Sequence, residues 1–377
     1  MRQLLLLSVL VSLLLCQSVS ADSMTVFLGT YTGGSSQGIY KCRLDMSSGK
    51  LSDLELAAET VNPSFLALHP NGQYLYAVGE IDDFGGQKAG GVSAYRIDRD
   101  THRLTLLNQT PSGGRGPCHL VVDHEGGHVL VANYGGGSCA AIAISADGKL
   151  GEQTSFHQHV GSSVNPNRQQ GPHAHSINVS ADNKFAFVAD LGLDKVLVYR
   201  FSANTGSLTP HDPPSVSVPS GGGPRHFAFH PSGKFAFSNN EILSSVNAFR
   251  YDANKGVLTL LHTISTLPAE HKGNSTAETQ VHPNGKFVYV SNRGHNSIAA
   301  FRFDAETGNL SKIENESTQG KTPRNFGIDP TGTFLLAANQ STNDVFVFRI
   351  DKESGALEPT SHKLDVPSAV CVKFLPN

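Results

Sequence analysis

The sequence predicts an all-β protein, a seven-bladed β-propeller, and three observations support this prediction. First, an inner-strand phrase recurs seven times, at residues 63–70, 117–124, 173–180, 224–231, 276–283, 323–330 and 367–374. Second, six of these copies continue through a tight turn such as PNG, PSG or PTG into a second apolar phrase. Third, a repeat of roughly 50 residues built from short alternating strands is typical of propeller blades.

The two chain ends are predicted to complete one blade together. The seventh copy stops at the C-terminus, and its missing second phrase, TVFLGTY, lies at residues 25–31. We therefore expect the N-terminal strand to pair into the C-terminal blade, which closes the ring and removes two exposed sheet edges.

Each blade is expected to contain four strands, as judged from alternating apolar residues. In the fourth blade these are predicted at 225–230, 234–240, 244–251 and 257–263. The polar stretch 151–172 departs from the repeat, and we expect a long loop that lies over one face of the ring before the third blade.

Residues 1–21 are predicted to be a secretory signal peptide. Arg2 supplies the positive charge, residues 4–15 the apolar stretch, and 19–21 (VSA) a small-residue cleavage site. Residues 22–377 would then form a single propeller domain, exported to the periplasm or secreted. No other stretch is long enough to span a bilayer.

Composition limits the partners and the cysteine chemistry. The net charge is −3 with no basic run, which argues against nucleic acid and acidic membranes as partners. We expect a small-molecule ligand and a monomer, although the sequence does not determine the oligomeric state. Cys118 and Cys139 fall on the first and third strands of one blade, too far apart for a disulfide. Free buried thiols are therefore favoured over disulfides for Cys42, Cys118, Cys139 and Cys371.

Topology brings two sets of residues to one face of the ring, here called face T; the opposite face, with the PNG-type turns, is face B. If each first strand runs from face T to face B, its start meets the end of the second strand on face T. The first-strand ring is Ser64, Cys118, His175, Arg225, Ala277, Arg324 and Ser368. The second-strand ring is Glu80, Tyr134, Leu191, Glu241, Arg293, Gln340 and Tyr31.

Four members of these rings form a candidate catalytic cluster: His175, Arg225, Glu241 and Arg293. They come from adjacent blades and combine an imidazole, a carboxylate and two guanidiniums. This set suits an anionic substrate and general acid–base chemistry on a carbonyl or ester. A salt-bridge network that merely fills the channel is the alternative.

The remaining histidines are assigned by position. His173 and His175 (HAH), and His157 and His159 (HQH), share a strand face at i and i+2 and could hold a metal, but supporting carboxylates are missing. We expect HQH to be solvated loop histidines, and no metal site. His69, His230 and His282 recur before proline on face B and are predicted to cap or pack the turns. A set of asparagines is expected to satisfy backbone groups at strand ends: Asn62, Asn133, Asn240, Asn292 and Asn339.

At GPHAHS, GGGPRHFAFHP, NNE and SNRGHNSI the chain resembles the lactonase family of seven-bladed propellers. That family includes propeller-type 6-phosphogluconolactonases and is related to the carboxy-cis,cis-muconate lactonising enzyme. The resemblance covers about residues 24–376. It implies a His, Arg, Glu and Arg active-site set, which falls on His175, Arg225, Glu241 and Arg293, and it implies no metal or organic cofactor.

The function expected from this sequence is hydrolysis of the ring ester of a sugar-acid lactone, as in a 6-phosphogluconolactonase-like carboxylic-ester hydrolase. His175 is the predicted base, and Arg225 and Arg293 are predicted to stabilise the oxyanion. Glu241 is expected to keep a low pKa and to orient its neighbours. Five further residues are predicted to bind substrate: His173, His226, Arg324, Arg168 and Gln340. A non-catalytic exported binding or scaffold propeller and a muconate-type cycloisomerase remain alternatives, and the substrate and reaction direction stay open.

Overall fold

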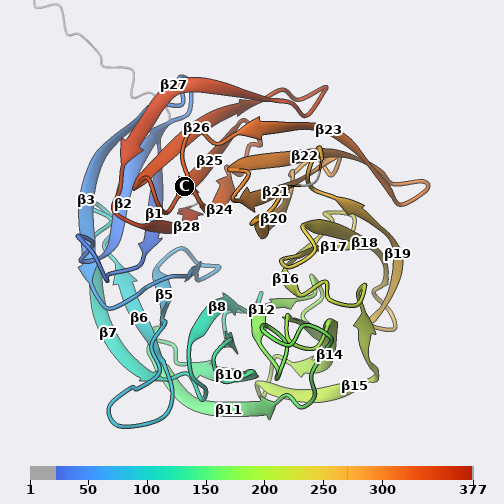
Figure 1. Cartoon of the computed structure of the whole chain (residues 1–377). Coiled ribbons are helices and arrows are strands. Elements are labelled where there is room, and N and C mark those ends of the chain that lie inside the picture. Colours follow the sequence, from blue (N-terminus) through green and yellow to red (C-terminus); the bar gives the residue numbers. More distant parts are fainter. Residues whose placement is uncertain (1–22, 270, 376–377) are drawn as a thin grey trace, which may run out of the picture.

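The computed structural model describes residues 23–269 and 271–375. Seven four-stranded antiparallel sheets are arranged around a central axis, which confirms the predicted propeller (Figure 1). The predicted signal peptide lies outside the described residues. Among the described residues, no helix is long and apolar enough to cross a membrane.

The strands of each blade follow one another from the centre of the ring outward. Blade one contains β4 (Leu66–Leu68), β5 (Tyr74–Gly79), β6 (Gly91–Ile97) and β7 (Leu104–Pro111). Blade two contains β8 (Pro117–Val122), β9 (His128–Asn133), β10 (Ser138–Ile144) and β11 (Leu150–Gln158). Blade three contains β12 (Ala174–Val179), β13 (Phe185–Asp190), β14 (Lys195–Ser202) and β15 (Ser207–Ser217). Blade four contains β16 (Pro224–Phe229), β17 (Phe235–Asn240), β18 (Ser245–Asp252) and β19 (Val257–Ser265).

The last three blades follow the same order, with the chain ends sharing the seventh. Blade five contains β20 (Ser275–Val281), β21 (Phe287–Arg293), β22 (Ser297–Asp304) and β23 (Asn309–Ser317). Blade six contains β24 (Pro323–Ile328), β25 (Phe334–Asn339), β26 (Asp344–Ile350) and β27 (Leu357–Asp365). Blade seven contains β28 (Ala369–Phe374), β1 (Ser23–Thr30), β2 (Gly38–Asp45) and β3 (Leu51–Glu59).

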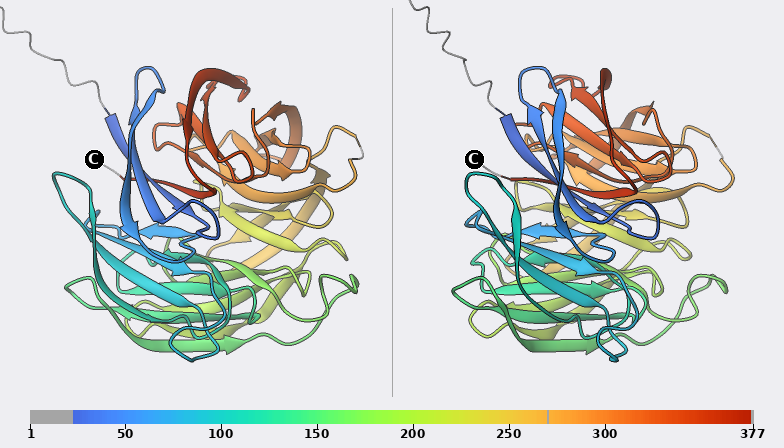
Figure 2. Two further views of the ribbon diagram at one scale, coloured as in Figure 1. Left: turned by 60° about the vertical axis from the view of Figure 1, so that its left-hand side comes forward. Right: turned by 90° about the vertical axis from the view of Figure 1, so that its left-hand side faces the viewer.

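The ring closes as predicted, because β1 pairs antiparallel with β28 from Val26↔Phe374 to Thr30↔Ala369. The first strand, in blue, lies beside the dark red last strand in blade seven (Figures 1 and 2). Val26, Phe27 and Leu28 of β1 are fully buried, so closure also completes the apolar packing on both sides of this blade.

Apolar cores lie between neighbouring blades. Between blades three and four, for example, the rings of Phe187 and Phe227 stack with centroids 5.5 Å apart. All four cysteines of the described chain, Cys42, Cys118, Cys139 and Cys371, are buried free thiols, as expected.

One boundary prediction was wrong. Residues 150–158, most of which were assigned to a loop, form the outer strand β11 of blade two. Its outward face is polar, so the apolar alternation that reveals other strands is weak here. Only residues 159–173 connect β11 to β12.

Candidate functional site

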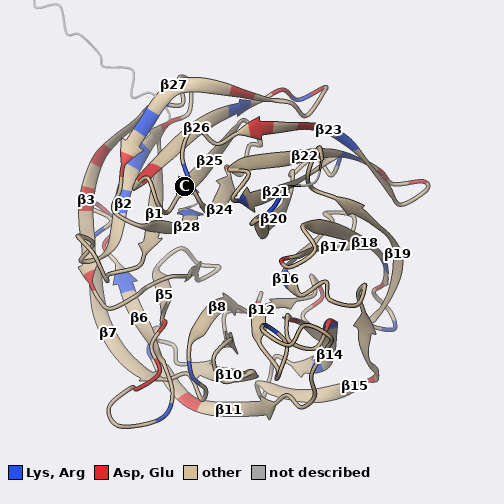
Figure 3. Ribbon diagram, in the orientation of Figure 1, with Lys and Arg blue, Asp and Glu red and all other residues tan. Residues whose placement is uncertain are grey.

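The strand ends on face T enclose a cavity of about 330 Å³ at the centre of the ring. Nine described residues line it, and seven of them belong to the two rings predicted from topology. These nine residues are Cys118, His175, Arg324, Glu80, Tyr134, Glu241, Arg293, Arg168 and Ser275. Charged residues are spread over the outer strands and turns, but basic residues also occur on inner strands such as β21 and β28 (Figure 3).

A repeated bulge at the start of the inner strands positions the first-strand ring. The pairing ladder skips Cys118 in β8, His175 in β12, Arg225 in β16 and Arg324 in β24. A bulge leaves the extra residue out of the ladder and re-aims its side chain. Residues at these points can therefore differ from blade to blade without disturbing the register of the sheet.

Glu241 is the centre of a buried ion cluster. Its Oε1 atom lies 2.6 Å from Arg168, and its Oε2 atom lies 3.0 Å from Arg225 Nε and 2.9 Å from Arg293. Burial favours the neutral acid, but Arg293, Arg225 and Arg168 outweigh it and lower the pKa of Glu241 to about 2. The carboxylate is therefore ionised at neutral pH and positions three guanidiniums.

The two predicted oxyanion-binding arginines, Arg225 and Arg293, both donate to backbone carbonyl groups of β20. Arg225 donates to the carbonyl oxygen of Ala277 at 2.6 Å, and burial followed by Arg293 and Arg324 lowers its pKa to about 9. It remains a cation at neutral pH. Arg293 donates to Thr276 O at 2.8 Å. Its Nε–H has no hydrogen-bond partner within the described chain, so it retains donor capacity for an anion.

His175 is a neutral imidazole in the wall of the cavity. Burial, reinforced by Arg225, lowers its pKa well below the usual range. Its Nδ1 atom lies 3.5 Å from Cys118 Sγ. Burial also raises the pKa of the Cys118 thiol well above its usual value, so this contact is with a thiol rather than a thiolate.

Glu80, which lines the cavity, is contacted by Tyr31 and Ser64; the sequence analysis placed all three on face T but did not nominate them. The Tyr31 hydroxyl donates to Glu80 Oε2 at 2.7 Å, and Ser64 Oγ donates to the same oxygen. Arg324 donates to the Tyr31 hydroxyl at 2.8 Å. Glu80 is thus a second carboxylate at the cavity, across the ring from Glu241. Glu80, Tyr31 and Ser64 could have been nominated from the sequence, because all three belong to the face-T rings and carry a carboxylate or a hydroxyl group.

Arg168 reaches the site from the connection between blades two and three. Its guanidinium contacts Glu241 and donates to the Tyr134 hydroxyl at 3.2 Å. The next residue, Gln169, is fully buried and donates to Leu191 O at 2.8 Å and to Asp194 at 2.7 Å. The loop is therefore fastened beside an arginine whose side chain is 41% exposed.

Three of the predicted substrate-binding residues lie outside the described lining of this cavity. His173 stacks on Tyr134 with ring centroids 4.6 Å apart and contacts the Tyr134 carbonyl through Nδ1. His226 lies deeper in the channel, with Nδ1 2.9 Å from Glu278. Gln340 is not among the described lining residues. Their roles in binding stay predictions, whereas Arg324 and Arg168 do line the cavity.

The HQH interpretation as solvated loop histidines was wrong. His157 lies on β11 and contacts Leu208 O at 2.7 Å, and His159 is buried with Nδ1 2.6 Å from Asp190. In the part of the chain that the structure describes, no group of three or more His, Cys, Asp and Glu residues is arranged to hold a metal.

The face-B histidines have the predicted structural role. Nε2 of His69, His230 and His282 contacts a turn carbonyl of the next blade, at 3.1, 2.8 and 2.8 Å. The predicted asparagines likewise bind backbone groups at strand ends, such as Asn292 to Thr266 O at 3.3 Å and Asn339 to Thr318 O at 3.0 Å.

Comparison with known proteins agrees with this fold. Residues 25–374 match the family model described as lactonase, 7-bladed beta-propeller. The 6-phosphogluconolactonase of Bacillus subtilis is 39% identical over 93% of this chain and 97% of its own length. The 6-phosphogluconolactonase of Formosa agariphila is 35% identical over 80% of this chain and 86% of its own length.

A solved structure extends the likeness. The periplasmic gluconolactonase of Pseudomonas aeruginosa superposes with a TM-score of 0.89 at 34% identity, covering 94% of this chain and 99% of that one. The chain belongs to the lactonase family of seven-bladed β-propellers. Within that family it is similar to 6-phosphogluconolactonases at 35–39% identity.

Proposed function

We propose that this chain is an exported carboxylic-ester hydrolase that opens the ring ester of a sugar-acid lactone on face T, without a metal or organic cofactor. One observation carries the proposal: a neutral buried imidazole, His175, shares a small cavity with guanidiniums that a carboxylate holds in place. The family assignment supports the reaction class, and the cavity geometry supports the roles of the residues.

The charge of the cavity favours an anion. Arg168, Arg293 and Arg324 line it together with only two carboxylates, Glu80 and Glu241, and Arg225 adds a further buried cation beneath. Guanidiniums suit carboxylate and oxyanion recognition because they donate two parallel hydrogen bonds. A volume of about 330 Å³ lies at the low end of ligand sites and suits a molecule of one sugar ring.

The proposed reaction proceeds in two steps. Water attacks the lactone carbonyl carbon while His175 accepts a proton from it, and the carbonyl oxygen becomes an oxyanion next to Arg293 and Arg225. The tetrahedral intermediate then collapses. The bond from carbon to the ring oxygen breaks, and the leaving alkoxide takes the proton back from His175. The product is an open-chain sugar acid, which ionises to a carboxylate.

Glu241 takes no proton in this scheme, because its pKa of about 2 makes it a poor base at neutral pH. It holds Arg168, Arg225 and Arg293 before substrate arrives, so the donors need no reorganisation during the reaction. Glu241 is therefore a positioning residue.

Export bears on the substrate. The predicted signal peptide would place the protein outside the cytosol, and a relative of the same fold is described as a periplasmic gluconolactonase. Phosphorylated lactones are the substrates named for other relatives. We therefore place an unphosphorylated sugar lactone first and a 6-phosphorylated one second.

The test is an initial-rate assay of the purified mature protein against γ- and δ-lactones of sugar acids, with and without a 6-phosphate, after subtraction of spontaneous hydrolysis. We expect turnover of at least one lactone that Arg293→Ala strongly reduces and Arg349→Ala, remote on face B, leaves intact. Ligand binding without turnover would favour a scaffold propeller. Activity confined to muconate-like diacids would favour a cycloisomerase.

A further inference from the structure

Neighbouring blades share a repeated contact near face B. An aromatic residue at the start of the second strand pairs with an arginine on the third strand, whose guanidinium lies over the ring. The pairs are Arg96 on Tyr74, Arg200 on Phe185, Arg250 on Phe235, Arg302 on Phe287 and Arg349 on Phe334, at 4.7–5.8 Å.

A glycine in a turn of the next blade completes this contact. At Gly148, Gly256 and Gly355 an added Cβ would lie 2.3 Å from the neighbouring aromatic ring. Each glycine also has a positive φ, between 68° and 83°. The ring of one blade therefore packs flat against the backbone of the next, and the interface has no room for a side chain.

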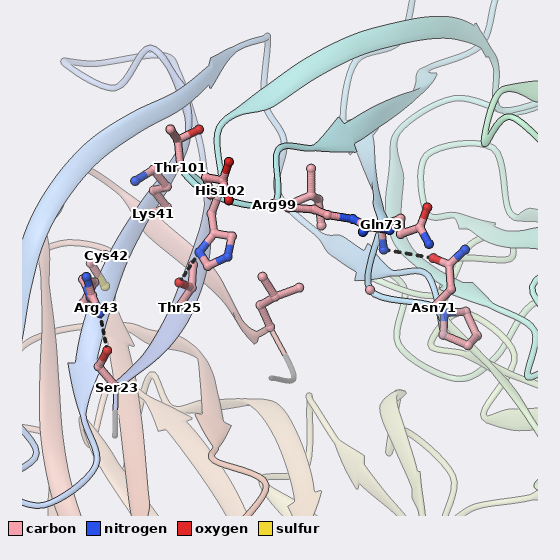
Figure 4. A pocket seen from close by; sticks show the side chains of 15 residues that line it. Ser23, Thr25, Lys41, Cys42, Arg43, Asn71, Gln73, Arg99, Thr101 and His102 are labelled. Carbon is pink, nitrogen blue, oxygen red and sulfur yellow. Dashed lines mark hydrogen bonds between the residues drawn. The ribbon is translucent and has the colours of Figure 1, made fainter. Parts of the chain in front are cut away.

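The junction between blades seven and one departs from this pattern at two places. In blade seven, Thr25 occupies the position that Phe334 occupies in blade six, because Thr25 pairs with Arg43 as Phe334 pairs with Arg349. The aromatic ring is therefore missing from blade seven. The turn position held elsewhere by glycine is His102, which keeps a left-handed φ of 53°. Its Nδ1 atom contacts Thr25 Oγ1 at 2.7 Å (Figure 4).

The missing ring leaves a cavity of about 540 Å³, here called the face-B notch, between β1, β2 and two turns of blade one. Figure 4 shows Arg43 beside Ser23 on the side of blade seven. His102 extends from a turn of blade one toward Thr25, and Arg99 from the same turn extends toward Gln73. The charged lining residues are Lys41, Arg43, Arg99 and Asp100. Lys41 is already paired with Glu55 at 3.2 Å, so Arg43 and Arg99 are the two cations left to receive an anion.

We propose that the face-B notch is a second binding site, remote from the face-T cavity, for a phosphate monoester that carries a flat ring. The ring would occupy the space that an aromatic side chain fills at the other junctions. The phosphate group would take charge-assisted hydrogen bonds from Arg43 and Arg99. This proposal does not depend on the lactonase proposal.

Two features of the notch are not explained by the loss of the aromatic ring alone. Arg43 keeps its place without a ring beneath it and donates instead to Ser23 Oγ at 2.5 Å. His102 holds a left-handed backbone conformation, which is strained for a residue with a Cβ. A glycine, as at the corresponding turns of other blades, would avoid this strain.

The experiment is isothermal titration of the mature protein with phenyl phosphate and with inorganic phosphate. The main variant is the double substitution Thr25→Phe with His102→Gly, which restores the repeated contact and fills the notch. We expect it to lose one phenyl phosphate site while the lactone turnover stays unchanged. Whatever the face-T arginines bind is common to both proteins, so the difference isolates the notch.

A pair of matched variants keeps the test decisive if the filled notch folds poorly. Arg43→Met removes the notch cation and should weaken phenyl phosphate at least ten-fold, whereas Arg349→Met, at a filled junction, should not. Identical isotherms for the native protein, Arg43→Met and the double variant would overturn the proposal. Inorganic phosphate that binds as tightly as phenyl phosphate would overturn the assignment of a ring-bearing ligand.

Discussion

Glu241→Gln tests whether the charge of Glu241 holds the face-T cluster together. In the folded protein its pKa is about 2, against an ordinary value of 4.5. Each pKa unit corresponds to about 1.4 kcal/mol, so the ionised carboxylate contributes about 3 kcal/mol to the free energy of unfolding at pH 7. Because Gln retains the shape of the side chain, the substitution removes mainly the charge.

The sign of the effect fixes its pH dependence. The folded-state pKa is depressed, so the contribution is complete above the unfolded pKa near 4.5 and disappears as the pH falls toward 2. We expect urea unfolding to show Glu241→Gln less stable than the native protein by about 3 kcal/mol at pH 7. This deficit should shrink steadily below about pH 4.5.

The control is Glu358→Gln, which removes a carboxylate from an exposed position on β27. It should change the free energy of unfolding by no more than about 0.5 kcal/mol at pH 7. A Glu241→Gln protein as stable as the native one at pH 7, or a deficit that is the same at pH 3, would refute the proposed electrostatic role.

Four further outcomes are expected. Arg293→Ala should lower kcat/KM by an amount that corresponds to a loss of roughly 2–4 kcal/mol of transition-state stabilisation. An equal loss in Arg349→Ala would contradict a specific role of Arg293 in stabilising the oxyanion. The pH profile of kcat/KM should have its acid limb below pH 6.5, because burial and Arg225 lower the pKa of His175; His175→Ala should remove that limb, and a limb that persists would point to another base. EDTA should leave both Tm and lactone turnover unchanged, and loss with rescue by a divalent ion would contradict the cofactor-free scheme. Phe27→Ala in the closing strand should cost about 3–5 kcal/mol in urea unfolding, with exposed Phe156→Ala as the control; similar small effects in both would mean that closure contributes little.

The fold could be predicted because its information is repeated. Seven copies of one strand-turn-strand pattern average out local ambiguity, and the split seventh copy identifies the closing strand β1. The prediction failed at β11, where the alternation is weak because most of its side chains are exposed and polar. The repeat also located the cavity, since positions that vary against a constant apolar pattern fall on the bulges of the inner strands.

The arrangement of side chains within the site was less accessible. That Arg168 reaches Glu241 depends on the path of a loop fastened by Gln169, which no repeat encodes. The link between Tyr31, Glu80 and Arg324 joins residues far apart in the chain and exists only after the ring has closed. The face-B notch is visible in the sequence only once the registers of β1 and β25 are known.

In the proposed reaction, the face-T cluster would serve both binding and catalysis through one electrostatic arrangement. Burial, reinforced by the cations around it, lowers the pKa of His175 and keeps its imidazole neutral, which is the form that accepts a proton from water. The same cations attract the carbonyl oxygen as it becomes negative. When that oxyanion forms, it offsets part of the positive potential from Arg225 and Arg324, so protonation of His175 becomes easier at the step that requires it. Glu241 prevents the arginines from dispersing, and it does so without competing for the proton because its pKa stays near 2. The basicity of His175 and the stabilisation of the oxyanion are therefore coupled through one set of charges, and the negative charge that develops on the substrate raises that basicity.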